Sequence, residues 1–301
     1  MSQPRITIIG AGRMGQGLGL ALKRRGYRVL LVNRTQREVI APLVLHQGSV
    51  AEATAGSELI LIATPDEAIT QVAEELAAQS AINHEQVVLH LSGLLDQSAL
   101  QPLQGTGAAC GSFHPVQTVA QPASAADRLK GAYVGVEGDE RAIVAAERLA
   151  NTLRMIPVRI PAEAKRAYHA GAAFVANYTI ALVGVAERLA SSVGVEPDIA
   201  ARLYLPLFAG AVANVTELGT AGALTGPLRR GDARTIQAHL EALRPEDRKL
   251  YRAVARAALR LAGEAGLTPS ELSRVKAILD EEEEDGDDVS TGPPPGHLWA
   301  P

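Results

Sequence analysis

The 301-residue sequence predicts an α/β fold, in which a doubly wound parallel sheet is followed by an all-helical second domain. Three observations support this prediction. A buried-strand run at 5–9 breaks into a turn with three spaced glycines, short apolar runs alternate with helical patterns over the first half of the chain, and the second half contains only helical patterns. The expected domains are 1–160 for the sheet and 161–280 for the helices, and 281–301 is expected to be a disordered acidic and Pro-rich tail.

The expected elements follow from hydrophobic periodicity. The strands are expected at 5–9, 28–32, 59–63, 87–91, 108–113, 132–136 and 156–160. Their nearly continuous apolar composition indicates a sheet that is covered on both faces. The long helices are expected at 162–192, 196–219, 232–243 and 246–279. The middle of the first is hydrophobic nearly all round, so other helices or a partner subunit must enclose it, and we expect a homodimer formed through the helical domain.

The glycine-rich turn after the first strand has the spacing of a Rossmann-type dinucleotide site. Gly10 permits the tight turn, Gly12 lets the backbone approach a pyrophosphate, and Gly15 allows the next helix to pack on the strand. The free N–H groups at the start of that helix, at Arg13 and Met14, are expected to hold the phosphates together with the helix dipole.

The end of the second strand indicates which dinucleotide is bound. Asn33, Arg34 and Thr35 stand where an NAD-selective site carries an acid on the ribose 2′-hydroxyl. An acid would repel a 2′-phosphate, whereas Arg34 can pair with it and its two neighbours can donate hydrogen bonds. NADP is therefore the expected cofactor. Thr35 has a second interpretation, because Thr35-x-x-Glu38 has the spacing of a capping box that begins a helix.

The third strand ends in Thr64 and Pro65, at the sheet edge that carries the ligand in doubly wound folds. These two residues are candidate contacts to the nicotinamide half of the cofactor. A turn before a helix explains them equally well, because Asp66 and Glu67 would then lie in its first turn.

Composition and charge exclude several classes of protein. The formal net charge of -4 and the pI of about 6.0 are far from the basic balance of a nucleic-acid-binding domain. Cys110 is the only cysteine, no signal peptide precedes the first strand, and polar residues interrupt the longest apolar stretch, at 170–186. We therefore expect a cytoplasmic protein with no nucleic-acid or membrane partner. The acids concentrate at 280–288, so the rest of the chain is mildly basic, which suits an anionic small-molecule substrate.

Polar side chains at two strand ends and on one helix are the candidate catalytic groups. Ser92 and His114 are expected at the ligand edge of the sheet, and Lys165, His169 and Asn177 share one broad face of the first long helix. Histidine exchanges protons near neutral pH, and lysine can polarise a carbonyl or bind a carboxylate. The alternatives are structural, namely hydrogen-bonded core histidines and a plain turn at Ser92.

Together these motifs resemble the family of Rossmann-like proteins with a DUF2520 C-terminal domain. The resemblance covers the chain to about residue 280 and rests on Gly10 to Gly15, Ala63 to Asp66, His90 to Gly93, Phe113 to Gln117, Lys165 to Asn177 and Leu224 to Asp232. The family is similar to pyrroline-5-carboxylate reductases, and the Lys-to-Asn spacing is similar to that of 3-hydroxyacid dehydrogenases and ketopantoate reductases. Ser92 and the His114-Pro115 pair resemble the serine and His-Pro motif of prephenate dehydrogenases, although Val116 and Gln117 depart from that motif.

The expected function is NADP-dependent hydride transfer to or from a small carbonyl, imine or hydroxy-acid substrate at the domain junction. His114 would be the general acid/base, Lys165 or His169 would anchor the substrate or supply a second proton, and Ser92 and Asn177 would donate hydrogen bonds. Two alternatives stay open, a non-catalytic NADP-binding sensor or scaffold and a deazaflavin that replaces or partners the nicotinamide. No metal is expected.

Overall fold

The computed structural model describes residues 5–281. They divide into two compact units, one ending at Ile180 and the other starting at Ala181. The division falls inside a long helix and not at the predicted residue 160, because the first turns of this helix pack on the sheet through Lys165 and Tyr168. The predicted tail at 281–301 lies outside the described residues apart from Glu281.

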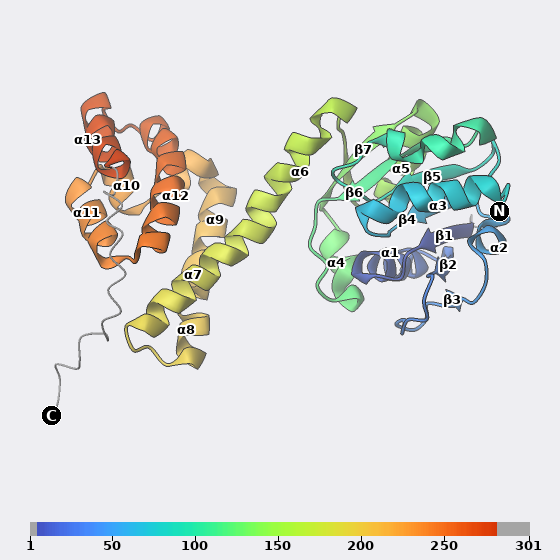
Figure 1. The fold of residues 1–301 in the computed structure, drawn as a ribbon, viewed down its shortest axis with the longest axis horizontal. Helices are drawn as coiled ribbons and strands as arrows, with labels where there is room; N and C mark the ends of the chain where they lie inside the picture. Colours follow the sequence, from blue (N-terminus) through green and yellow to red (C-terminus); the bar gives the residue numbers. More distant parts are fainter. Residues whose placement is uncertain (1–4, 282–301) are drawn as a thin grey trace. The chain divides into compact units, whose positions relative to one another are not determined.

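The first unit is built on one sheet with the strand order β3-β2-β1-β4-β5-β6-β7-β8 (Figure 1). The strands are β1 (Arg5–Ile9), β2 (Arg28–Val32), β3 (Leu45–His46), β4 (Leu59–Ile62), β5 (Val87–His90), β6 (Ala109–Pro115), β7 (Tyr133–Gly138) and β8 (Ile156–Arg159). Neighbouring strands are parallel except β6 and β7, which pair antiparallel with His114 opposite Gly135. The predicted doubly wound sheet is confirmed. The prediction lacked the two-residue strand β3 and the reversal at β7.

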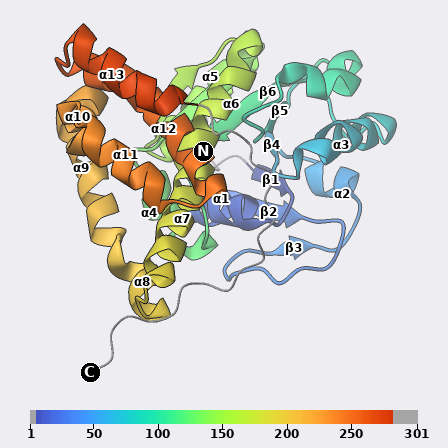
Figure 2. The ribbon, with the colours of Figure 1, turned by 60° about the vertical axis from the view of Figure 1, so that its left-hand side comes forward.

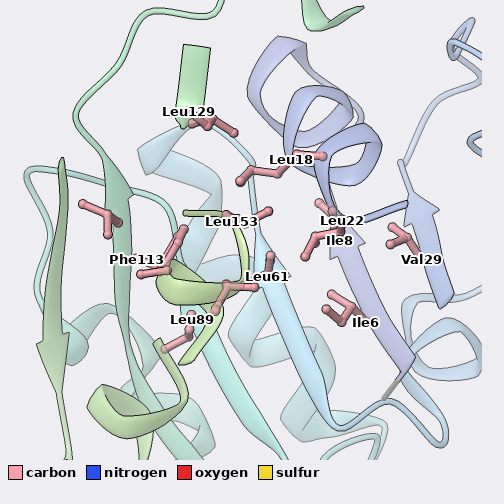
Figure 3. Close-up of a cluster of buried hydrophobic side chains, with 14 of the residues drawn as sticks. Ile6, Ile8, Leu18, Leu22, Val29, Leu61, Leu89, Phe113, Leu129 and Leu153 are labelled. Atoms are coloured by element: carbon pink, nitrogen blue, oxygen red, sulfur yellow. The ribbon is translucent and has the colours of Figure 1, made fainter. Parts of the chain in front are cut away.

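Helices cover both faces of this sheet. The helices of this unit are α1 (Arg13–Arg24), α2 (Val50–Thr54), α3 (Asp66–Ala78), η1 (Gln97–Thr106), η2 (Pro122–Ser124), α4 (Ala125–Leu129), α5 (Glu140–Thr152), η3 (Ala162–Ala164), α6 (Lys165–Ala173) and the π-helical turn η4 (Phe174–Tyr178), which has no buried residue. Successive strand residues enter opposite cores. Ile60 and Ile62 pack with α3 and η1, whereas Leu61 packs with Leu18 of α1 and Phe113 of β6 (Figure 3). Burial on both faces explains why the strands read as continuous apolar runs.

The second unit is helical throughout its described residues, as predicted (Figure 2). Its helices are α7 (Thr179–Ser192), α8 (Pro197–Leu203), α9 (Leu205–Ala223), α10 (Gly226–Arg230), α11 (Ala233–Ala242), α12 (Pro245–Glu264) and α13 (Pro269–Asp280). The expected single helix at 246–279 is two helices. Gly266 has φ of 101°, and Thr268 then starts α13 with a capping box to Glu271.

Two of the long helices are apolar and exposed. The helix 162–192 and the segment 197–230 are long and hydrophobic enough to cross a membrane by length and composition alone. Helix α9 has no buried residue, and Leu207 is 71% exposed. Charged residues interrupt the pattern, because Arg188 of α7 forms a bidentate ion pair with the buried Asp247 of α12. Much of the apolar surface of these helices is therefore left uncovered by neighbours within their own unit.

Candidate active site

The glycine-rich turn has the geometry that a pyrophosphate needs. Gly10 has φ of 113°, and a Cβ there would lie 2.5 Å from the carbonyl oxygen of Ala63. A Cβ on Gly15 would overlap the Gly10 carbonyl, whereas Gly12 faces open space. Helix α1 begins at Arg13 without a side-chain cap and without an acid in its first turn. The N–H groups at Arg13 and Met14 are therefore available to an anion.

The end of β2 borders a pocket of about 130 Å³, lined by Asn33 to Gln36 and by Leu45 to Gly48 of the neighbouring β3 region. No carboxylate lines it. The Arg34 guanidinium donates to Gln71 Oε1 at 3.2 Å, on the exposed surface. Asn33 instead joins two loops, because its Oδ1 accepts from Ala11 N at 3.1 Å and its Nδ2 donates to Thr35 O at 2.8 Å.

The capping-box interpretation of Thr35 is wrong, because no helix starts there. Residues 36–40 form a loop that precedes the cis peptide Ala41–Pro42. The buried Gln16 holds this loop. Its side chain donates to Glu38 O and accepts from Ile40 N, so these two backbone groups of the loop are satisfied without a helix.

Thr64 and Pro65 lie at the carboxyl end of β4, beside the glycine turn. The Thr64 hydroxyl is buried and has no hydrogen-bond partner among the described residues. Pro65 is the N-cap of α3 and supplies no side-chain cap, with Asp66 and Glu67 in the first turn. The buried Thr64 hydroxyl therefore has an unfilled hydrogen bond. It lies next to a helix start without a side-chain cap and near the open face of Gly12, and a bound dinucleotide can supply the missing partner.

The hydrogen bonds of Ser92 agree with its interpretation as part of a plain turn. Its hydroxyl donates to Asp66 Oδ2 at 2.9 Å and accepts from the backbone N–H groups of Leu94 and Leu95 at 3.1 and 3.0 Å. The residue is 6% exposed. These contacts fix the turn after β5 and leave the hydroxyl no further proton to donate.

His114 and His169 meet over Gly93, at the same edge of the sheet. Their ring centroids are 5.8 Å apart in an edge-to-face arrangement. A Cβ on Gly93 would lie 2.7 Å from His114 Cε1 and 2.7 Å from His169 Cδ2. Gly93 therefore permits the close approach of the two imidazoles. The His114 Nδ1 atom is 2.8 Å from the hydroxyl of Tyr168.

Burial lowers the pKa of His114 to about 4, and electrostatic interactions with His169 and Lys165 act in the same direction. The imidazole is therefore neutral at physiological pH and donates from only one ring nitrogen. Burial also raises the pKa of Tyr168 to about 12, opposed by a backbone hydrogen bond from Gly135. Both members of this pair are uncharged.

Lys165 is buried beneath this cluster and is 2% exposed. Its Nζ donates to Ser92 O at 3.2 Å and to Ser112 Oγ at 2.6 Å, and it lies 4.0 Å from Glu137 Oε2. Burial lowers the pKa of Lys165, and the charge of Glu137 opposes this effect. The ammonium thus ties the first turn of α6 to the turn after β5 and to strands β6 and β7, and its donors point into the protein.

The structure brings His114 and His169 together at the ligand edge and places Ser92 and Lys165 directly behind them. Asn177 lies apart. It is exposed on the π-helical turn η4, eight residues beyond His169, which corresponds to about 12 Å along a helix.

Two residues of the cluster were missed in the sequence. Tyr168 follows Lys165 by three positions, and residues three apart lie on the same face of a helix. The helical spacing therefore indicates that Tyr168 and Lys165 share a face. Glu137 accepts hydrogen bonds from Ser112 and Gln97, and no motif marked it.

Two family models match the chain. Residues 1–115 match the Rossmann-like domain, and residues 132–258 match the domain of unknown function DUF2520. No curated protein matches the sequence.

Several solved structures share the fold. A Bacteroides fragilis protein provisionally named an NADP oxidoreductase is 23% identical with a TM-score of 0.70, over 86% of this chain and 98% of that one. A Plasmodium falciparum pyrroline carboxylate reductase with NADP bound is 12% identical with a TM-score of 0.59, over 92% and 99%. A reductive aminase from Aspergillus terreus in complex with NADPH and ethyl-5-oxohexanoate is 20% identical with a TM-score of 0.56, over 92% and 93%. The family models thus identify a Rossmann-like domain followed by a DUF2520 domain in this chain, the combination that its motifs predicted.

Proposed function

We propose that this protein is an NADP-dependent oxidoreductase that transfers hydride between the nicotinamide and a small carbonyl, imine or hydroxy-acid substrate. The observation that carries the proposal is the His114–His169 cluster over Gly93 at the carboxyl edge of the sheet. In the order β1-β4-β5-β6 this cluster lies three strand spacings, about 14 Å, from the glycine turn of β1. A dinucleotide whose pyrophosphate lies on that turn extends along this edge toward the two histidines.

Gly12 and the first amides of α1 would hold the pyrophosphate, and the Thr64 hydroxyl would gain its missing partner from the cofactor. Arg34 and Thr35 would bind the 2′-phosphate, because the pocket at the end of β2 carries a guanidinium and no acid. The nicotinamide supplies or accepts the hydride. His114, with a single N–H in its neutral form, would be the general acid/base that exchanges a proton with the reacting group, and His169 would flank it.

We also propose that a second copy of this chain covers the exposed helices 162–192 and α9. Both are apolar, yet Arg188 and Glu217 lie within the apolar segments, which a soluble interface tolerates better than a lipid core. Homodimers bury more apolar surface than other interfaces, which suits a helix with no buried residue.

The test of the proposed function is consumption of NADPH across a panel of keto acids, aldehydes and cyclic imines, followed by comparison with His114→Asn. Turnover of the variant is expected to fall about 10² to 10⁴-fold, the range for a lost acid/base group, while NADPH affinity changes only a few-fold. His84→Asn is the control, because His84 lies away from this edge in the turn before β5. Unchanged turnover in His114→Asn would return this histidine to a structural role.

A further inference from the structure

Three features of the structure fix the contact between Tyr168 and His114. The phenol oxygen lies 2.8 Å from Nδ1, and the rings meet edge to face with centroids 5.5 Å apart. A side chain at position 135 would clash, because a Cβ on Gly135 would lie 2.6 Å from the Tyr168 hydroxyl. Lys165 anchors the turn of α6 that precedes Tyr168. The pair is therefore preorganised before any ligand binds.

The direction of this hydrogen bond follows from the phenol proton. Within residues 5–281, the one side-chain hydrogen-bond partner of the Tyr168 hydroxyl is His114 Nδ1, at 2.8 Å. If Nδ1 donated instead, the half-buried phenol would have no acceptor among the described residues. A neutral imidazole carries one proton, so the proton of His114 is on Nε2.

The Nε2–H group lies at the ligand edge. A Cβ on Gly93 would lie 2.8 Å from His114 Nε2, so this atom faces the turn after β5 and not the interior of the sheet. Tyr168 Oη, the His114 imidazole and the turn after β5 thus follow one another at the carboxyl edge of the sheet.

We propose that Tyr168 and His114 form a proton relay that serves a carbonyl/hydroxyl couple, an inference that rests on the proposed oxidoreductase function. As hydride from a reduced nicotinamide reaches the carbonyl carbon, the π electrons move to oxygen. That oxygen takes the proton of Nε2, and Nδ1 takes the proton of Tyr168. The imidazole passes between its two neutral tautomers, and the phenolate regains its proton from water. Oxidation of the hydroxyl runs through the same steps in reverse.

This relay favours an oxygen substrate over an imine. An imine accepts hydride readily only after it is protonated, and an imidazole whose Nδ1 accepts from Tyr168 is neutral and holds no surplus proton for it. A nascent alkoxide is basic enough to take a proton from a neutral N–H while the phenol replaces that proton. Tyr168 is a positioning residue under this proposal, because it acts through His114.

The deciding experiment is nitrogen NMR of the full chain with ¹⁵N-labelled histidine, without substrate. We expect His114 to show a protonated Nε2 and an unprotonated Nδ1 at neutral pH, with its resonances identified by their loss in His114→Asn. Tyr168→Phe should shift the Nδ1 resonance of His114 by removing its donor. Tyr251→Phe is the matched control, because Tyr251 pairs with His239 Nδ1 at 3.0 Å in the same edge-to-face geometry and should affect only that histidine.

A protonated Nδ1, an imidazolium at neutral pH, or an unshifted His114 in Tyr168→Phe would overturn the relay. Kinetics with a reacting ketone give the second readout. Tyr168→Phe should lower kcat at least about tenfold and change the solvent deuterium isotope effect, with KM and NADPH affinity preserved. Turnover of imines alone would overturn the carbonyl assignment. Failure of every compound to oxidise NADPH would remove the proposed function, whereas the tautomer measurement would still decide the arrangement of the pair.

Discussion

Arg34 lies in a pocket at the end of β2 that no carboxylate lines. Arg34→Ala should weaken NADPH binding by roughly 1.5 to 3 kcal/mol, because a charge-assisted hydrogen bond to the 2′-phosphate is lost, and should leave NADH binding nearly unchanged. Fluorescence titration with both cofactors measures the difference. Arg37→Ala is the control, since Arg37 belongs to the same loop but does not line the pocket. Equal dissociation constants of the parent protein for NADPH and NADH would contradict the assignment.

Individual residues of the candidate site were predictable where a local motif marked them. Gly10 and Gly12 belong to such a motif, and His114 stood at a strand end. The contact partner Tyr168 was not predictable in the same way, because it meets His114 across 54 positions of sequence. The burial of Lys165 was not predictable from the sequence either, because a lysine on a helix is ordinarily exposed. Its partners Ser112 and Glu137 come from two other elements.

Lys165 acts at the scale of elements, because it joins α6 to two strands and to the turn after β5. Lys165→Met should lower the free energy of unfolding by about 3 to 5 kcal/mol, since it leaves the Glu137 carboxylate buried without its cation. Denaturant unfolding measures this loss. The double variant Lys165→Met/Glu137→Leu should recover part of it. A loss below about 1 kcal/mol together with a raised KM would instead support the expectation from sequence that Lys165 anchors the substrate.

The positions of the strands were predicted to within a few residues, and their parallel direction was predicted for all but β7 and β8. Continuous apolar runs report burial on both faces, which is the same for parallel and antiparallel neighbours. The reversal between β6 and β7 therefore left no trace in the hydrophobic pattern. In the helical unit, Gly266 and the Thr268 capping box are signals for the end of one helix and the start of the next. The hydrophobic periodicity on each side was nevertheless similar enough to suggest one helix.

The stability of the whole molecule should fall in acid because of two buried histidines. Burial lowers the pKa of both His90 and His114 from 6.5 to about 4. Between those values the unfolded chain binds more protons than the folded one, so stability decreases as the pH falls from about 6.5 to about 4. Each histidine contributes at most about 3 kcal/mol. Thermal unfolding across this window should show a shallower slope in His114→Asn, and an unchanged slope would contradict the shifted pKa.

The oligomeric state concerns the whole molecule as well. Light scattering coupled to size-exclusion chromatography should give twice the chain mass of 31.6 kDa. Leu207→Glu should shift the protein toward the monomer, because it puts a charge on an apolar helix that the second copy is proposed to cover. Val44→Glu is the control, since Val44 is an exposed apolar residue of the sheet unit. A monomeric parent protein, or recovery with membranes, would contradict the dimer.

The antiparallel step between β6 and β7 also decides where the chain goes after the sheet. Strand β8 runs with β7, so it leads away from the edge where β1, β4, β5 and β6 end. The helix that follows must double back, and along α6 the contacts advance from Ser112 at Lys165 to His114 at Tyr168. With an all-parallel sheet, the last strand would finish at the ligand edge and its helix would depart from there. The antiparallel pairing of β6 and β7 thus returns the chain after the sheet to the edge that carries His114.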